Sequence, residues 1–120
     1  MLHVKHMPFI NTKTTVKISK EQEEIIKSKL GEAITLIPGK SETWLMVGFE
    51  DEYSLYFKGQ ASEKIAFVEV KIFGKADDAA YDKLTAAICD IYKEVLMIPG
   101  DKIYVKYEEV DHWGWNGMNF

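Results

Sequence analysis

The sequence predicts an α+β fold in which two β-α-β repeats form a four-stranded mixed sheet with two helices on one face. The main observation is an internal repeat: Ile37-Pro38-Gly39 and Ile98-Pro99-Gly100 lie 61 residues apart, and each triplet ends an apolar-periodic helical segment. A run of strand-forming residues follows each triplet, and another precedes each helical segment, at residues 8–14 and 65–73. A repeated supersecondary unit constrains the fold more strongly than any single element does.

The first repeat is predicted to contain a strand at residues 8–14, a helix from Ser19, and a second strand. Ser19 and Gln22 have the spacing of a capping box. Apolar residues then recur on one helical face, at Ile26, Leu30, Ala33, Ile34 and Ile37. Pro38 ends the helix because proline disfavours helical geometry in the residue before it. The run Trp44-Leu45-Met46-Val47 is predicted to begin the second strand.

The second repeat is predicted to contain a strand at residues 65–73, a helix from Asp78 to Met97, and a last strand. Side chains alternate between two sides along the first of these strands. The side expected to pack against the helices carries Ala66, Val68, Val70 and Ile72. In the last strand, Ile103, Val105 and Tyr107 share a side. Tyr104 and Lys106 share the opposite side.

The sheet face opposite the helices is expected to be apolar and uncovered. Strand-helix-strand crossovers are almost always right-handed, which places both helices on one face. The other face then carries Phe67, Phe73 and part of the run at residues 44–47. Because an exposed apolar face of this kind promotes aggregation, we expect a closed oligomer in which the sheets of several copies face one another.

Length and composition indicate one globular domain. The chain has 120 residues, of which 47% are apolar and 28% are charged. We expect residues 8–120 to form the domain and residues 1–7 to be an N-terminal leader. The net charge of −4 argues against non-specific nucleic-acid binding, and no apolar run reaches the ~18 residues that span a membrane. His3 and His6 have no third ligand nearby, so no metal site is expected there.

Pro8 is the first candidate catalytic residue because it directly follows a methionine, Met7. A small second residue permits removal of an initiating methionine, and an N-terminal proline is a secondary amine with a free lone pair. In an apolar pocket near cations such an amine is neutral at pH 7 and accepts a proton from carbon. The alternative is that Pro8 only begins an edge strand.

Other residues are candidates for ligand binding. Lys40 follows the first triplet and is either a carboxylate anchor or a solvated loop lysine. Tyr104 and Lys106 either reach the pocket of a neighbouring subunit or lie on an exposed strand face. The aromatic tail Trp113-Gly114-Trp115-Asn116-Gly117 is expected to dock, as a pocket wall, as a clamp across a subunit seam, or as both.

Together these motifs resemble the macrophage migration inhibitory factor branch of the tautomerase superfamily. The matching segments, from Met7 to Phe120, are Pro8-Phe9-Ile10, Ile37-Pro38-Gly39-Lys40, Ile72-Phe73-Gly74-Lys75, residues 98–105 and residues 113–117. The resemblance implies a homotrimer with active sites at subunit interfaces. It also implies a cofactor-free isomerase for the keto–enol tautomerisation of phenylpyruvate-like 2-keto acids, or for dopachrome-type substrates. We expect a cytoplasmic location, with secretion without a signal peptide as the alternative.

The resemblance assigns roles to individual residues. By motif match, Pro8 is the general base and Lys40 holds the substrate carboxylate. Phe73 stands where the family places a residue whose backbone contacts the substrate, and Tyr104 matches a tyrosine contributed by the adjacent subunit. Three further residues complete the substrate-binding set. Trp44 matches an aromatic residue at the pocket rim, and Trp113 matches a position in the pocket wall. Lys106 stands where the animal cytokine has asparagine.

Three hypotheses about function follow. The first is a tautomerase that uses Pro8, with the second cation of Lys106 strengthening carboxylate binding. The second is a protein-binding or cytokine-like trimer in which the tautomerase chemistry is incidental. The third is a silent family member, because a Pro8 that remains attached to residues 1–7 is a tertiary amide without a basic nitrogen.

Overall fold

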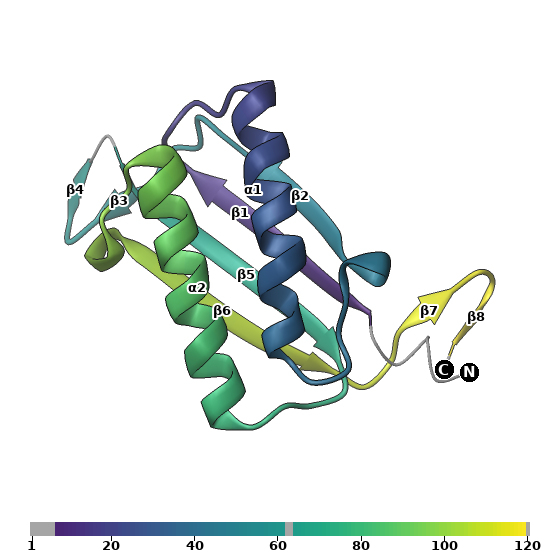
Figure 1. The fold of residues 1–120 in the computed structure, drawn as a ribbon. Coiled ribbons are helices and arrows are strands. Elements are labelled where there is room, and N and C mark those ends of the chain that lie inside the picture. The colour runs from purple at the N-terminus through teal and green to yellow at the C-terminus, as the bar shows by residue number, and fades with distance from the viewer. Residues whose placement is uncertain (1–6, 62–63, 120) are drawn as a thin grey trace.

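Two helices lie side by side on one face of a four-stranded sheet (Figure 1). The computed structural model describes residues 7–61 and 64–119, so residues 1–6 of the predicted leader and Phe120 lie outside the described residues. The helices and the strands of the sheet are α1 (Lys20–Ala33), α2 (Asp78–Leu96), β1 (Pro8–Thr14), β2 (Met46–Glu50), β5 (Ala66–Phe73) and β6 (Ile103–Val110). The described residues also form the hairpin strands β3 (Tyr56–Phe57), β4 (Gln60–Ala61), β7 (Gly114–Trp115) and β8 (Met118–Asn119), and the 3₁₀ turns η2 (Ile34–Leu36), η3 (Glu42–Trp44) and η4 (Gly100–Lys102).

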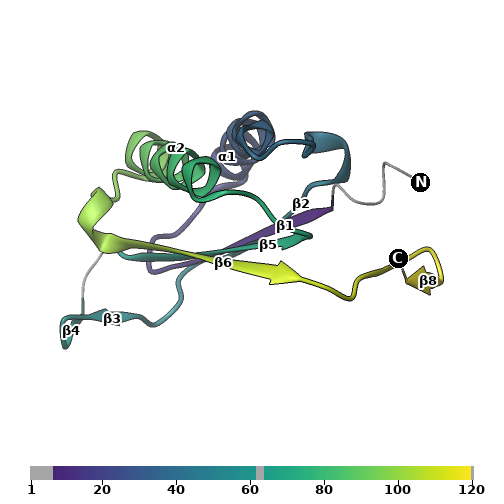
Figure 2. The same cartoon turned by 90° about the horizontal axis from the view of Figure 1, so that it is seen from below.

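The strand order is that of a mixed sheet, β2-β1-β5-β6. β1 is parallel to β2 and β5 is parallel to β6, whereas β1 and β5 are antiparallel. Figure 2 shows both helices on one side of the sheet and the β3–β4 hairpin on the other. The fold class predicted from the internal repeat is therefore confirmed, because each pair of parallel strands is connected through one helix on the same face.

The core lies between the helices and the sheet, as the alternation in the sequence predicts. Every second residue of β5 is buried: Ala66, Val68, Val70 and Ile72. These residues belong to one cluster with buried helix residues such as Leu30, Leu84 and Ile88. Thr12 of β1 also points into the core, where its hydroxyl forms a hydrogen bond with the hydroxyl of Tyr92. The buried hydroxyls of Thr12 and Tyr92 therefore have a hydrogen-bond partner without reaching solvent.

The first helix starts as predicted but changes character before its predicted end. The side chain of Ser19 accepts a hydrogen bond from the backbone of Gln22, and the side chain of Gln22 accepts one from the backbone of Ser19. This is the predicted capping box. The α-helical geometry ends at Ala33, and the 3₁₀ turn η2 carries the chain on to Leu36.

The second strand begins later than the sequence predicts. Trp44 and Leu45 were expected in this strand, but Trp44 belongs to η3 and β2 begins only at Met46. The backbone N–H of Leu45 donates to the carbonyl of Glu42, a bond within the 3₁₀ turn. Strand-forming residue types therefore did not prevent a local turn here, because tertiary context overrides β-propensity.

The two Ile-Pro-Gly triplets adopt different backbone conformations. In the first, the N–H of Lys40 donates to the carbonyl of Ile37 at 3.0 Å, and Gly39 has a φ of +83°. Proline followed by a glycine with positive φ is the signature of a type II turn. In the second, Pro99 leads into η4. The second helix has already ended, at Leu96, because Met97 adopts the left-handed conformation with a φ of 60°.

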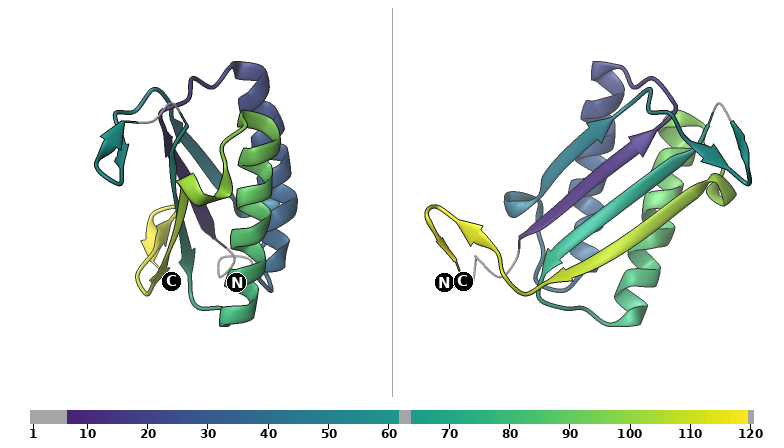
Figure 3. Two further views of the ribbon diagram at one scale, coloured as in Figure 1. Left: turned by 90° about the vertical axis from the view of Figure 1, so that its left-hand side faces the viewer. Right: turned by 180° about the vertical axis from the view of Figure 1, so that it is seen from behind.

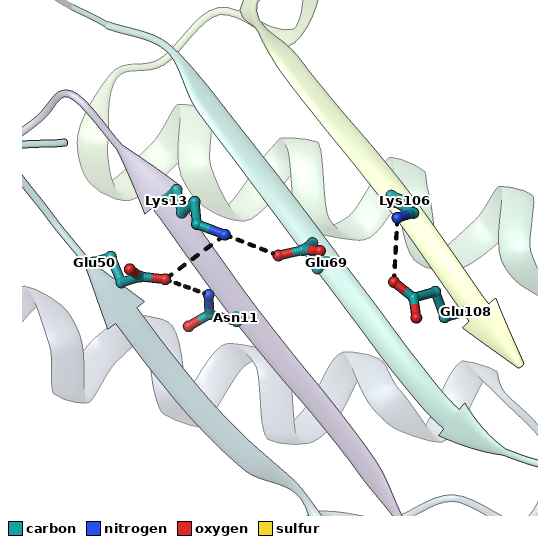
Figure 4. Close-up of polar contacts among 6 residues, drawn as sticks. All are labelled: Asn11, Lys13, Glu50, Glu69, Lys106 and Glu108. Atoms are coloured by element: carbon teal, nitrogen blue, oxygen red, sulfur yellow. Dashed lines mark hydrogen bonds and ion pairs between the residues drawn. The ribbon is translucent and has the colours of Figure 1, made fainter. Parts of the chain in front are cut away.

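The sheet face opposite the helices is charged at its centre, which corrects the apolar face expected from the sequence. Figure 4 shows Lys13 between two carboxylates, with its Nζ 3.1 Å from Glu69 and 3.9 Å from Glu50. Asn11 donates to Glu50 at 2.8 Å, and Lys106 lies 3.2 Å from Glu108. Phe67 and Tyr104 lie toward one end of this face and Phe73 toward the other, while Phe9 pairs with Lys71. Apolarity alone therefore does not require this face to be covered.

Candidate active site

A cavity of about 520 Å³ opens beside the start of β1. Pro8 forms part of its wall, together with Trp44 from η3 and Trp113 from the C-terminal segment. Trp115 is a further part of the wall, so all three tryptophans of the chain line this one cavity. Three residues selected from the sequence as catalytic or substrate-binding, Pro8, Trp44 and Trp113, are thus brought together.

Lys40 is held at the same end of the sheet by the type II turn that precedes it. Its side chain is buried, with 7% of the residue exposed, and its Nζ donates to the carbonyl of Phe73 at 2.9 Å. Phe73 ends β5 and directly follows Ile72, which pairs with Pro8. Burial lowers the pKa of the Lys40 ammonium because desolvation disfavours its charged form. The sequence left open whether Lys40 is a solvated loop lysine, and the structure shows a buried one.

The backbone of Met7 extends the pairing of β1 by one residue. The N–H of Phe73 donates to the carbonyl of Met7 at 3.2 Å. Met7 is itself buried and lines the cavity beside Pro8. While Met7 remains attached to Pro8, the backbone N–H of Phe73 is therefore hydrogen-bonded to the Met7 carbonyl.

The C-terminal hairpin β7–β8 contributes Trp115, which belongs to the tail predicted to form a pocket wall or a clamp but was not among the individually assigned site residues. Trp115 lies edge-on to Trp44, with ring centroids 5.2 Å apart and an interplanar angle of 88°. The hairpin turns at Asn116 and Gly117, whose φ values of 53° and 82° fit a type I′ turn. The Asn-Gly pair was the available sequence signal, because it is the commonest type I′ sequence.

Tyr104 and Lys106 do not reach the Pro8 cavity of their own chain. In the sheet register Tyr104 pairs with Phe67, whereas Pro8 pairs with Ile72. Phe67 and Ile72 are five positions apart along β5, or about 17 Å at ~3.3 Å per residue. Lys106 pairs with Glu69, three positions or about 10 Å from Ile72, and neither Tyr104 nor Lys106 lines the cavity. Figure 3 likewise shows the β3–β4 and β7–β8 hairpins at opposite ends of the sheet. Tyr104 and Lys106 would contact a Pro8 cavity only in another copy of the chain.

In residues 7–61 and 64–119, no group of three or more His, Cys, Asp or Glu side chains is placed to hold a metal ion. Neither helix within this part of the chain has the length and apolarity needed to cross a bilayer.

Comparison with known proteins places this fold and cavity in a family. The family model described as macrophage migration inhibitory factor (MIF) matches residues 7–120. The chain belongs to the MIF family. A curated relative, macrophage migration inhibitory factor from Meriones unguiculatus, is 26% identical over 116 residues, which cover 95% of this chain and 99% of the relative.

Solved structures of MIF proteins have the same fold. The crystal structure of Leishmania major MIF2 has a TM-score of 0.89 and 30% identity, and the match covers 96% of this chain and 98% of that one. The MIF homologue from Prochlorococcus marinus has a TM-score of 0.83 and 28% identity, with 93% and 98% of the two chains covered. Membership in the MIF family, and its place in the tautomerase superfamily, confirm the resemblance identified from the sequence.

The buried Lys40 makes a measurable prediction about stability and pH. Its folded-state pKa lies below the ordinary value of 10.5. Between these two values the unfolded chain binds more protons than the folded chain, so Lys40 makes the free energy of unfolding rise with pH in this interval. We expect Lys40→Met to remove this rise, as measured by denaturant unfolding across an alkaline pH series. An unchanged pH slope in Lys40→Met would contradict the prediction.

Proposed function

We propose that this MIF-family chain catalyses the keto–enol tautomerisation of phenylpyruvate-like 2-keto acids, with the amine of Pro8 as general base once Pro8 is the first residue. The observation that carries the proposal is the position of Pro8, buried in the wall of a cavity with three tryptophans, beside the strand end where Lys40 is held. A neutral amine is favoured in such surroundings, because both desolvation and a nearby ammonium disfavour its protonated form.

The chemistry is a transfer of one proton. The lone pair of the Pro8 nitrogen takes a proton from C3 of the 2-keto acid, and the electrons of that C–H bond form the enolate. The protonated Pro8, or water, then returns a proton to the enolate oxygen. In the reverse direction the same nitrogen delivers the proton to C3. A positioned base of suitable pKa accelerates such a step by about 10²–10⁴-fold.

Binding groups are available for both ends of the substrate. The Lys40 ammonium is the anchor for the carboxylate, since charge-assisted hydrogen bonds to carboxylates are short and strong. The cavity formed by Trp44, Trp113 and Trp115 accommodates the aryl group, because aromatic rings pack well in edge-to-face arrangements. Dopachrome-type substrates share an aryl group and a carboxylate and belong to the same proposal.

A homotrimer completes the proposed site. Tyr104 and Lys106 do not line the Pro8 cavity of their own chain. In a closed trimer each copy supplies them to its neighbour. There the Tyr104 hydroxyl donates to the developing enolate oxygen, and Lys106 adds a second positive charge for the carboxylate.

Hydrogen–deuterium exchange at C3 of phenylpyruvate tests the proposal directly. The protein whose chain starts at Pro8, as verified by intact mass, is incubated with phenylpyruvate in D₂O, and loss of the C3 proton signal is followed by NMR. We expect exchange well above the buffer rate that is unaffected by a metal chelator, because the base is an amine. Exchange no faster than in buffer refutes the proposed function.

A further inference from the structure

The β3–β4 hairpin lies near Tyr104 on the open face of the sheet, which is the face opposite the helices. β3 and β4 pair only with each other and not with the four-stranded sheet. Lys58 and Gly59 have φ values of 54° and 75°, which fit a two-residue type I′ turn. Figure 2 shows the hairpin on the side of the sheet away from the helices. Side chains, rather than ladder hydrogen bonds, therefore hold it beneath β6.

The contact between the hairpin and Tyr104 is a ring pair. Phe57 of β3 lies edge-on to Tyr104, with ring centroids 5.4 Å apart and an interplanar angle of 88°. The Nζ atoms of Lys58 and Lys102 lie 5.6 and 5.8 Å from the centre of the Phe57 ring. Aromatic pairs favour this edge-to-face geometry, and a cation within about 6 Å of a ring centre is attracted to it. Phe57 is thus fixed by two cations while its ring contacts Tyr104.

Tyr104 needs such support because little else restrains it. The residue is 61% exposed. Within the described part of the chain its hydroxyl has no hydrogen-bond partner. On a strand, two χ1 rotamers are common for an exposed side chain, so an unsupported Tyr104 would occupy several orientations. The edge-to-face contact with the Phe57 ring favours one of them.

We propose that Phe57 is a positioning residue for Tyr104. It holds the tyrosine hydroxyl in the orientation that serves the Pro8 site of a neighbouring copy. This inference rests on the proposed function, because Tyr104 has a catalytic role only if the neighbouring site uses it. Restricting a donor before the substrate arrives lowers the cost of orienting it in the transition state.

A double-mutant cycle on Phe57 and Tyr104 tests the proposal. The variants Phe57→Leu, Tyr104→Phe and their combination are compared with wild type, all starting at Pro8, by kcat/KM for phenylpyruvate. We expect Tyr104→Phe to lower kcat/KM about 30-fold, as for loss of a hydrogen bond to a charged group. Phe57→Leu is expected to lower it about tenfold in the wild-type background, mostly in kcat, and less than twofold in the Tyr104→Phe background.

Control variants separate positioning from general damage. Phe57→Tyr keeps the ring and is expected to retain near-wild-type activity. Tyr56→Leu changes the neighbouring hairpin residue, which is 70% exposed, and should leave kcat unchanged. The mass of the assembly in solution is measured for every variant. An equal loss of activity from Phe57→Leu in both backgrounds overturns the proposal, because it indicates a structural role that does not act through Tyr104.

A second measurement keeps the inference separable from the proposed function. Fluorotyrosine is placed at position 104, and its ¹⁹F signal is compared between wild type and Phe57→Leu. We expect Phe57→Leu to narrow the signal and shift it toward its position in the unfolded chain. If the wild type is inactive but Phe57→Leu still changes the ¹⁹F signal in this way, the proposed tautomerase function is refuted, while the inference that Phe57 orients Tyr104 stands. An unchanged ¹⁹F signal overturns the inference whether or not the protein is active.

Discussion

Retention of residues 1–7 is expected to lower the tautomerase activity about 10³-fold relative to the chain that starts at Pro8. In the longer chain the Pro8 nitrogen is part of a tertiary amide, whose lone pair is delocalised into the carbonyl and does not accept a proton at neutral pH. The contribution of a positioned general base, about 10²–10⁴-fold, is then lost. The Met7 carbonyl also occupies the N–H of Phe73 at the edge of the cavity.

The comparison uses two proteins, one translated from Met1 and one from Met7. Intact mass shows which N-terminus each carries, and denaturant unfolding shows whether both are folded. Activity is measured as C3 exchange of phenylpyruvate. If the protein that keeps residues 1–7 exchanges as fast as the one starting at Pro8, the amine of Pro8 is not the base.

Replacement of Pro8 by glycine is expected to lower kcat/KM about 10²-fold in chains that both start at residue 8. Glycine keeps an N-terminal amine, but its backbone is free to adopt conformations that the proline ring forbids. The nitrogen lone pair is then no longer fixed near C3 of the substrate, and a misplacement of about 1 Å costs on the order of 10²-fold in rate. The loss should be mainly in kcat, because Lys40 and the tryptophans that bind the substrate are unchanged.

Pro99→Ala is the matched control for this substitution. Pro99 occupies the corresponding triplet of the second repeat, far along the chain from Pro8, and does not line the Pro8 cavity. We expect its kcat/KM to stay within twofold of wild type. Equal activity in Pro8→Gly and wild type would contradict the prediction, because it would mean that the proline ring is not needed to position the nitrogen lone pair.

The fold was predictable because its signals are local. The capping box at Ser19 and the alternation along β5 each involve neighbours in sequence, and the structure contains both. The Ile-Pro-Gly triplets follow the two helices, although the α-helical geometry ends a few residues earlier, at Ala33 and Leu96. The same alternation placed Tyr104 on the face away from the helices, where it lies. The right-handed preference of strand-helix-strand crossovers then placed the helices of both repeats on the same face of the sheet.

The charged centre of the open face was not predicted because its partners come from different strands. Lys13, Glu50 and Glu69 are brought together by the pairing of β1 with both β2 and β5. Alternation identifies the face that a residue occupies but not its neighbours across the sheet, which depend on register. The ring pair between Phe57 and Tyr104 depends in the same way on the return of a hairpin to a distant strand.

The candidate site was predictable in part. Pro8, Trp44 and Trp113 were selected by motif match, and they share one cavity. Trp115 was predicted only as part of the aromatic tail, as a pocket wall or a clamp, and the Asn116-Gly117 turn signal that places it was present in the sequence. The burial of Lys40 had no local signal, because its side chain contacts the carbonyl of Phe73, at the end of a strand 33 residues further along the chain.

The ion pairs on the open face affect how copies of this chain would associate. Removing polar groups from water contributes to the heat capacity with the opposite sign to removing apolar groups. Association of subunits across Lys13, Glu50 and Glu69 would therefore have a smaller change in heat capacity per unit of buried area than association of two apolar sheet faces. Its strength would vary less with temperature, and bound water would be retained between the subunits.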